Sequence, residues 1–510
     1  MMRRPVFLLL AVGAIVVSAL RPIPAIGAPG DECVKLVGHA ASGEKLSMDP
    51  AVNTAIEDLL YLPNIYDALV DLDASFRPVP VLAESWQQSP DGRQWTFRLR
   101  RGVKFHDGRD FTSADVVYTF KRLLDPATAS GARATLGFLD PEQIEAVDSH
   151  TVRFTTKQPV VDFPVATRNK FTYIIPNGMK SEDFAKRGIG TGPFLQESFT
   201  LGAPFNILKR NPRYWQAGFP KAECLRTSIV GEPVTRAAAI LSGDADVVVL
   251  VDMATVPNLS KNPKVQLLRT GGASAMVIAM WVDTKPFNDK RVRQALKLVI
   301  DRKAINDTVF LGMGELGNDS PVPPSNPVAY STEIPKRDVA KAKALLTEAG
   351  YPGGIQVDLY SSTNLPGMLG IAQAFVQMAA EAGIRINLVQ APPATYWSET
   401  WLKVPFMTSG WAARPPAEAL GVAYRKTAKW PETHWFRDDY DALLDRADGT
   451  ADPARRADIL KQAQRMLAEE GGAIIPVFAP VIAGVRAECS GYVPHPSLNY
   501  LDFKSVSCKR

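Results

Sequence analysis

The sequence predicts an α/β fold that is divided into two or three domains. At 510 residues, the chain is too long for a single hydrophobic core. Segments with helix start and stop signals alternate with short apolar runs typical of strands, such as residues 246–251 (DVVVLV) and 473–478 (AIIPVF). No internal repeat or low-complexity segment interrupts this alternation.

The strands in the first half of the chain alternate apolar and polar residues. This pattern is found in residues 95–108 (WTFRLRRGVKFHDG), 151–156 (TVRFTT) and 205–210 (FNILKR). A period of two places one set of side chains against the core and the other toward solvent. We therefore expect half-exposed strands here.

Helices are predicted from their capping residues. Residues 111–126 (FTSADVVYTFKRLLDP) start with Thr112 or Ser113 as the cap and carry Asp115 in the first turn. Further helices are expected to begin after Asp289, Asp338 and Asp452, with Pro453 in the first helical position, and to end at Gly350 and Gly471. The acid pair Asp438 and Asp439 is expected at another helix start.

The N-terminus has the pattern of a secretory signal peptide, which we assign to residues 1–28. Arg3 and Arg4 precede an apolar run of about 15 residues, and small residues follow it. The run is short for a membrane span, which needs about 20 residues. Cys33 follows Gly30, Asp31 and Glu32, which is not a lipoprotein-like setting. We expect an exported protein without a lipid anchor.

Four cysteines remain, and none forms a C-x-x-C pair, so zinc binding is not expected. In an oxidising compartment an even number of cysteines indicates disulfides. Cys489 and Cys508 bracket a short C-terminal segment, and we pair them with each other. Cys33 and Cys224 then form the second pair, because both precede apolar runs (VKLVG and LRTSIVG) that can lie side by side.

Composition and motifs argue against several functions. The net charge of +5 is spread along the chain without a basic block, so no nucleic-acid or membrane partner is expected. No hydrolase elbow, zinc-protease motif, phosphate loop or dinucleotide fingerprint occurs. The five histidines lack metal-ligand spacing. We therefore expect no catalytic residues, no metal and no cofactor, and a binding protein rather than an enzyme.

Several segments resemble one protein family. Residues 79–126 (VPVLAESWQQSPDGRQWTFRLRRGVKFHDGRDFTSADVVYTFKRLLDP) are similar to the signature of the extracellular solute-binding proteins of family 5. The family serves ABC transporters for dipeptides, oligopeptides, nickel and opines. Four further segments follow in the family's order: GTGPF, RNPRYW, PFNDKRVRQALKLVIDRKAI and AKALLTEAGYPGG. The resemblance covers nearly the whole chain after the signal peptide.

The resemblance implies a periplasmic-binding-protein-like fold with two lobes and three domains around a ligand cleft, linked by hinge strands. Domain I is expected in three pieces, and all four cysteines fall within them. The implied boundaries are residues 29–64, 188–278 and 483–510 for domain I, 65–187 for domain II and 279–482 for domain III.

The resemblance also implies which residues face the ligand. The family's cleft segments match an early loop, a segment where the chain crosses between the lobes, a glycine–tryptophan segment and an aromatic residue after IIP. In this sequence they are Asn53, Thr54, Ala55, Trp281, Gly410, Trp411, Ala412, Ala413, Arg414 and Phe478.

The segment GWAAR, residues 410–414, departs from the family's peptide binders. It lies in a glycine- and proline-rich break, where we expect irregular backbone. In peptide-binding relatives, an aspartate three residues after the tryptophan pairs with the peptide's ammonium group. Arg414 occupies that place here. A guanidinium suits carboxylate or phosphate, so we expect an anionic, opine-like or peptide-like solute. Alternatively, Arg414 turns away from the cleft and pairs with Glu418 or with an acidic residue of another domain.

The expected function is a periplasmic, monomeric receptor that delivers a solute to the membrane permease of an ABC importer. Two alternatives remain open at this point: a solute sensor that reports to a chemoreceptor, and an unmodified peptide binder. An enzyme that reuses the cleft is disfavoured because no acid/base pair or nucleophile motif is present. Nickel binding is disfavoured because His434 is the one histidine near the expected cleft segments.

Overall fold

The computed structural model describes residues 32–38, 47–53, 60–184, 187–200, 203–393 and 395–509. The predicted signal peptide, Thr54 and Ala55 lie outside the described residues. Among the helices that are described, none has the length and apolar character needed to cross a membrane.

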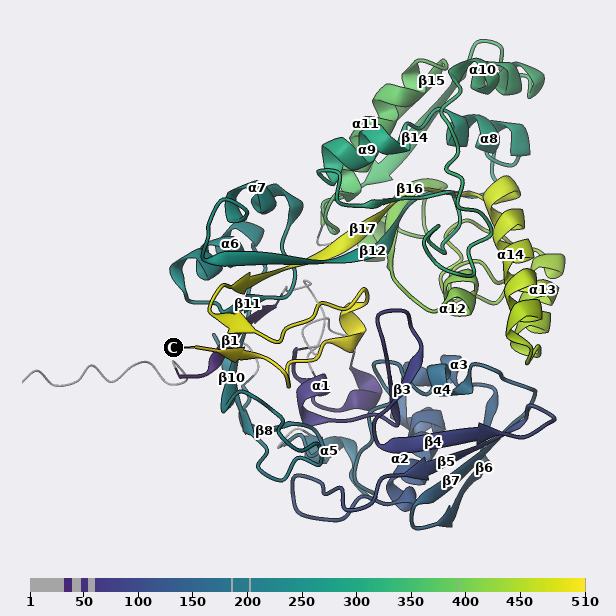
Figure 1. The fold of residues 1–510 in the computed structure, drawn as a ribbon. Coiled ribbons are helices and arrows are strands. Elements are labelled where there is room, and N and C mark those ends of the chain that lie inside the picture. Colours follow the sequence, from purple (N-terminus) through teal and green to yellow (C-terminus); the bar gives the residue numbers. More distant parts are fainter. Residues whose placement is uncertain are drawn as a thin grey trace, which may run out of the picture.

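The chain forms two lobes that are joined by two long strands (Figure 1). We call residues 32–264 and 487–509 the N-lobe and residues 281–472 the C-lobe. The joining strands are β12 (Val265–Met280) and β17 (Ala473–Arg486), which pair antiparallel and carry several register shifts. The two-lobed α/β fold expected from the sequence is therefore confirmed.

Both joining strands belong to one eleven-stranded sheet that runs through the two lobes. Strand β13 (Glu315–Leu316) pairs with β17 outside the main order. That order is β15 (Ile384–Gln390), β14 (Ile355–Ser361), β16 (Phe406–Ala412), β12, β17, β11 (Val247–Val248), β1 (Val34–Gly38), β10 (Cys224–Ile229), β9 (Asn206–Arg210) and β8 (Phe194–Ser198).

The N-lobe also contains a four-stranded antiparallel sheet with α2 (Ser113–Leu124) beside it. Its order is β4 (Ala83–Gln88), β5 (Gln94–Leu99), β7 (Thr151–Thr156) and β6 (Leu139–Asp148). The alternation predicted for β5 and β7 buries every second residue against the lobe core. Thr112 caps α2, and its backbone N–H donates to Asp115 Oδ2 at 2.8 Å, so the predicted start is confirmed.

The C-lobe covers its part of the large sheet with helices on both sides (Figure 1). Asp289, Asp338 and Asp452 each cap a helix through a side-chain oxygen, as their positions predicted. The helices are α8 (Lys290–Leu298), α9 (Arg302–Val309), α10 (Val339–Glu348), α11 (Met368–Ala380), α12 (Pro416–Gly421), α13 (Asp438–Asp448) and α14 (Pro453–Glu470).

Short elements complete the described part of the chain. The helices are α1 (Leu62–Ile65), α3 (Ala132–Thr135), α4 (Phe163–Ala166), α5 (Ser181–Phe184), α6 (Pro233–Ser242) and α7 (Val256–Leu259). The strands are β2 (Val70–Leu72), β3 (Pro78–Pro80), β18 (Cys489–Ser490) and β19 (Ser507–Cys508). Single helical turns are η1 (Pro50–Val52), η3 (Pro126–Thr128), η4 (Met253–Thr255), η5 (Tyr396–Thr400) and η6 (Leu498–Tyr500).

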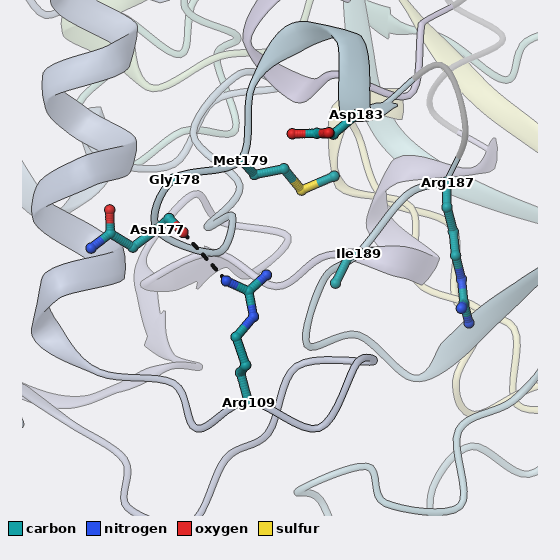
Figure 2. Close-up of a pocket in the computed structure, with 7 residues that line it drawn as sticks. All are labelled: Arg109, Asn177, Gly178, Met179, Asp183, Arg187 and Ile189. Carbon is teal, nitrogen blue, oxygen red and sulfur yellow. Dashed lines mark hydrogen bonds between the residues drawn. The ribbon is translucent and has the colours of Figure 1, made fainter.

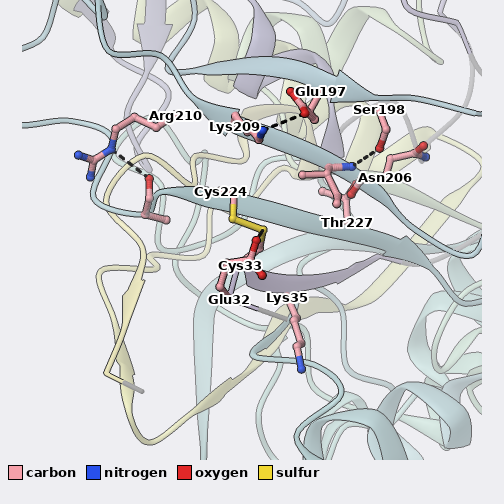
Figure 3. The surroundings of a disulfide bond; sticks show 12 residues. Glu32, Cys33, Lys35, Glu197, Ser198, Asn206, Lys209, Arg210, Cys224 and Thr227 are labelled. Atoms are coloured by element: carbon pink, nitrogen blue, oxygen red, sulfur yellow. Dashed lines mark hydrogen bonds and ion pairs between the residues drawn. A yellow bond between two sulfur atoms is a disulfide. The ribbon is translucent and has the colours of Figure 1, made fainter. Parts of the chain in front are cut away.

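Two disulfides staple the N-lobe, and both have the predicted partners. Cys33 bonds to Cys224 at the starts of β1 and β10, which lie side by side as expected and run parallel (Figure 3). Cys489 bonds to Cys508 across the β18–β19 pair. The first bond ties the N-terminal strand β1 to β10 of the large sheet, and the second ties β19 near the C-terminal end to β18.

The two lobes also touch each other away from the joining strands. Asp162 of the N-lobe forms an ion pair with Arg456 at the start of α14. The backbone N–H of Val161 donates to the carbonyl oxygen of Asp448 at 3.3 Å. The structure is therefore an arrangement in which the faces of the lobes are in contact.

Candidate functional site

The first three residues of the segment GWAAR lie in a strand, and the last two lie beyond its end. Gly410, Trp411 and Ala412 end β16, where they pair with Met276, Ala275 and Ser274 of β12. The expectation of irregular backbone was wrong for these three residues, because β12 offers a long partner strand here. Ala413 and Arg414 follow as irregular backbone and lead into α12.

The strand register brings two predicted site residues into one row. Ala275 pairs with Trp411 on one side and with Phe478 of β17 on the other. Directly paired residues of antiparallel strands project from the same face of a sheet. Trp411 and Phe478 therefore share a face across a small alanine. Trp411 is half-buried, whereas Phe478 is only 2% exposed.

Gly410 is required by close packing on the opposite face of the strand. A Cβ atom at this position would lie 2.6 Å from Cδ1 of Leu365, a side chain that packs against the core of the C-lobe. A larger residue would displace that side chain or β16. The absence of a side chain at Gly410 therefore allows β16, and with it Trp411, to lie close to Leu365.

Trp411 is held by a carboxylate that sequence reasoning missed. Its Nε1–H donates to Glu432 Oε1 at 2.7 Å. Its ring centroid lies 5.9 Å from that of Trp401 and 6.0 Å from that of Trp430. The sequence signal was weak: one glutamate in KWPETHW, 21 residues after Trp411, with nothing local to mark its partners.

The guanidinium of Arg414 lies beside the Trp411 ring, with Cζ 5.2 Å from the ring centroid. Its Nε–H donates to Glu418 Oε1 at 3.1 Å, and Nη1–H donates to the Ala412 carbonyl oxygen at 2.9 Å. The ion pair that we considered as the alternative is therefore present. No hydrogen bond to Nη2 occurs within the described residues.

Arg414 and Glu418 also lie close to the C-terminal segment of the N-lobe. Burial raises the pKa of Tyr500 above its usual range. The negative charge of Glu418 raises this pKa further, whereas the positive charges of Arg168 and, more weakly, Arg414 lower it. Tyr500 ends η6, donates to the Arg168 carbonyl oxygen at 3.2 Å and carries the Arg168 guanidinium over its ring. The region around Arg414 is thus electrostatically connected to both lobes.

Trp281 follows β12 directly and stacks on His434, with ring centroids 4.0 Å apart and planes inclined by 15°. The Nδ1 atom of His434 lies 2.9 Å from Asp283 Oδ2. The Nε1–H of Trp281 is buried and has no hydrogen-bond partner among the described residues. Trp281 remains a candidate site residue, with one polar group still available.

Asn53 is fully buried at the end of the η1 turn. Its Nδ2 donates to the carbonyl oxygens of Pro50 at 2.7 Å and Lys170 at 2.8 Å. Its Oδ1 atom has no hydrogen-bond partner within the described part of the chain. The adjoining Thr54 and Ala55 are outside that part. The side chain therefore links two N-lobe segments and keeps one acceptor unused.

A separate pocket of about 360 Å³ is formed by residues of the N-lobe alone, so it is distinct from the GWAAR region. Figure 2 shows Arg109 donating to the Asn177 carbonyl oxygen at its edge. The pocket is lined by Arg109, Asn177, Gly178, Met179, Asp183, Arg187 and Ile189.

Metal-ligand chemistry is not offered by the cysteine clusters. Two groups combine cysteine sulfurs with Glu32 or Asp246, but every cysteine in them is part of a disulfide. A disulfide sulfur is not the thiolate that binds zinc or nickel. These clusters therefore carry no metal assignment.

Two lobes joined by paired strands, with aromatic and charged residues gathered beside those strands, define a bilobal solute-binding protein. Residues 77–429 match the bacterial extracellular solute-binding proteins of family 5, and the chain belongs to this family. Family members bind small solutes or peptides and work with ABC transporter permeases, so the solute-binding function expected from the sequence is confirmed.

Three known proteins illustrate the similarity. Heme-binding protein A of Haemophilus influenzae is 30% identical over 490 residues, which cover 87% of this chain and 86% of the relative. The binding protein AgaA from A. tumefaciens R10, solved with agropinic acid, is 26% identical with a TM-score of 0.78; the match covers 94% and 99% of the two chains. A third is the ABC transporter-associated periplasmic binding protein DppA from Helicobacter pylori, solved with the peptide STSA. It is 25% identical with a TM-score of 0.79, and the match covers 94% of this chain and 98% of DppA.

Proposed function

We propose that this protein captures an anionic small solute, opine-like or peptide-like, between its lobes and delivers it to the permease of an ABC importer. One observation carries the choice of an anion. Arg414 stands three residues after the segment's tryptophan, where the family's peptide binders are expected to carry an aspartate. A guanidinium at that place repels the ammonium group of a free peptide and attracts a carboxylate or phosphate.

The surroundings of Arg414 support this choice. Its side chain is 20% exposed, and its Nη2 group has no hydrogen bond within the described residues. The free N–H groups of Nη2 leave this partly buried guanidinium able to donate to an incoming carboxylate. Glu418, its present partner, is 52% exposed, and such an ion pair contributes at most about 1 kcal/mol. A solute anion can share or replace it.

The comparisons are compatible with an anionic solute without fixing its identity. One relative was solved with agropinic acid, and another is named for heme, which carries two propionate groups. A third was solved with the free peptide STSA, which carries both an ammonium and a carboxylate. We group this chain with the first two relatives because Arg414 is positively charged and favours an anionic solute.

The same proposal includes the cellular setting. The signal-peptide pattern of residues 1–28 supports export to the periplasm. The protein acts there as a monomer without enzymatic activity. A sensor that passes its bound state to a chemoreceptor is the second candidate, because lobe closure serves either partner; loss of solute uptake on deletion favours transport.

Two probes with opposite charge test the anion proposal. N-acetyl-alanyl-alanine carries only a carboxylate, and alanyl-alanine amide carries only an ammonium group. We expect the protein to bind the acetylated acid more tightly in calorimetric titrations. Arg414→Asp is expected to weaken that binding about 10- to 100-fold, because a charge-assisted hydrogen bond is replaced by repulsion.

Arg153→Gln is the matched control for this test. Arg153 is also an ion-paired arginine, 3.7 Å from Glu145, but it lies on the four-stranded sheet of the N-lobe. This variant is expected to bind both probes as the unchanged protein does. Equal binding of the acetylated acid by the unchanged protein and by Arg414→Asp would refute the role of Arg414.

A further inference from the structure

The carboxylate of Glu432 is fully buried and has no cationic partner among the described residues. The side chain is 0% exposed. It accepts hydrogen bonds from Ser409 Oγ at 2.6 Å, Trp411 Nε1 at 2.7 Å and Trp401 Nε1 at 3.2 Å. All three donors are neutral. Burial raises the pKa of Glu432 above its usual value, and the three hydrogen bonds offset this only in part.

A buried carboxylate without a counter-charge is unfavourable, so its presence needs a reason. An ionised carboxylate only accepts hydrogen bonds and has lone pairs for several donors. It can therefore satisfy two indole N–H groups and a hydroxyl at once. A glutamine at the same place would turn an NH₂ group toward one of these donors. The arrangement suits a carboxylate whose task is to orient the two tryptophans.

These tryptophans belong to a larger aromatic surface, which we call the tryptophan row: Trp397, Trp401, Trp411 and Trp430. Neighbouring ring centroids in the row are 5.3, 5.9 and 6.0 Å apart. Trp397 is 39% exposed, and the other three are half-buried. The neighbouring Tyr396, in contrast, is fully buried in the core.

Two cations lie over the row. The Arg414 guanidinium is 5.2 Å from the centroid of Trp411, and the Lys429 ammonium is 4.9 Å from that of Trp430. Lys429 is exposed and forms no ion pair within the described part of the chain. Neighbouring ring planes are inclined by 90°, 58° and 54°, so each indole offers a separate face for stacking, with positive charge close to two of the rings.

We infer that Glu432 is a positioning residue that fixes Trp401 and Trp411, so that the tryptophan row selects a solute with an anionic group attached to a flat, unsaturated body. This inference rests on the proposed function, because it assigns the anionic group to Arg414. It adds the shape of the solute and the residue that sets the selectivity for that shape. Stacking of a flat ring on an indole contributes about 0.5–1.5 kcal/mol beyond simple burial.

Two probes that differ only in ring flatness test the inference. N-benzoylglycine and N-cyclohexanecarbonylglycine share the carboxylate, the amide and the number of ring carbons. We expect the protein to bind the benzoyl probe about three- to tenfold more tightly in calorimetric titrations. Glu432→Gln is expected to bring this ratio close to one by weakening only the benzoyl probe, since the rings lose their fixed orientation.

Tyr424→Phe is the control variant. The Tyr424 hydroxyl is buried, has no hydrogen-bond partner in the described residues and feels the charge of Glu432. Removing it perturbs the same neighbourhood without touching the indoles, so the ratio is expected to stay unchanged. If Glu432→Gln does not fold, Trp401→Phe carries the same expectation, because it removes one of the two indole donors.

Three results overturn the inference: no binding of the benzoyl probe at about 10 mM, no preference for it, or an equal loss for both probes in Glu432→Gln. An equal loss indicates a role in folding alone. The anion proposal fails differently, because Arg414→Gln is expected to weaken both probes by the same factor. If Arg414→Gln changes neither probe while Glu432→Gln removes the ratio, the aromatic surface stands and the anion clamp falls.

Discussion

The guanidinium of Arg414 meets three kinds of neighbour: an indole ring, a half-exposed carboxylate and a backbone carbonyl. The indole and the carbonyl oxygen carry no net charge, and the Glu418 side chain is 52% exposed, so its ion pair with Arg414 is weakened by solvent. In the proposed ligand cleft, such a cation is stabilised by an anion beside it. At the scale of the residue, this balance is the physical basis of the proposed solute class.

His106 is a second residue whose charge is governed by its place in the fold. It is buried, its Nε2 lies 3.0 Å from the Gly192 carbonyl oxygen, and its Nδ1 accepts from the Gly190 N–H at 3.4 Å. The imidazole thus joins the KFHDG segment to the GTGPF segment. Burial lowers the pKa of His106 from 6.5 to about 4, and the hydrogen bond to Gly192 only partly offsets this.

This depressed pKa predicts a loss of stability in acid. Between pH 6.5 and about pH 4 the unfolded chain binds a proton at His106 that the folded chain does not. The contribution of His106 is therefore complete above pH 6.5 and falls as the pH drops, by a total of about 3 kcal/mol. We expect His106→Gln, which cannot take up that proton, to show a shallower acid loss in chemical unfolding. Parallel curves for the two proteins would contradict this.

At the scale of the elements, local signals in the sequence predicted starts and stops well. Asp289, Asp338 and Asp452 were assigned as caps because a cap is a contact between residues two or three positions apart. The adjacency of β1 and β10 was expected from the cysteines that precede both runs; their parallel direction was not. The caps depend on contacts between residues that are near in sequence. The strand adjacency could be inferred because four cysteines allow only a few pairings.

Features that depend on distant partners were not predicted. The strand character of Gly410–Ala412 comes from pairing with β12, which lies more than 130 residues earlier in the chain. Glu432 escaped notice because Ser409, Trp411 and Trp401 reach it from 21 to 31 residues away in the sequence. The resemblance to a family assigned the GWAAR segment to the ligand cleft but gave no sign of the Glu432 carboxylate that holds Trp411.

At the scale of the whole molecule, polar contacts between the two lobes favour the closed arrangement. Asp162 and Arg456 are paired across the lobes, and Arg456 also donates to the Ala447 carbonyl oxygen at 3.0 Å. Asp448, whose carbonyl receives the Val161 N–H, is itself paired with Arg425 at 2.7 Å. These polar contacts favour the arrangement in which the lobes meet.

We expect Asp162→Asn to shift the solute-free protein toward a more open arrangement. A partly exposed ion pair contributes up to about 1 kcal/mol, so the apparent affinity for solute is expected to fall by at most about fivefold. Small-angle X-ray scattering measures the accompanying increase in radius of gyration. The double exchange Asp162→Arg with Arg456→Asp is expected to restore both values. An unchanged radius and affinity in Asp162→Asn would show that the contact does not bias closure.

The most direct measurement of the central claim is native mass spectrometry of the protein purified from the periplasm, followed by release and fragmentation of any bound solute. The account predicts one small molecule that carries a carboxylate or phosphate and no free ammonium group at the position facing Arg414. A ladder of ordinary peptides would contradict it, because those ligands place an ammonium group where the structure holds a guanidinium.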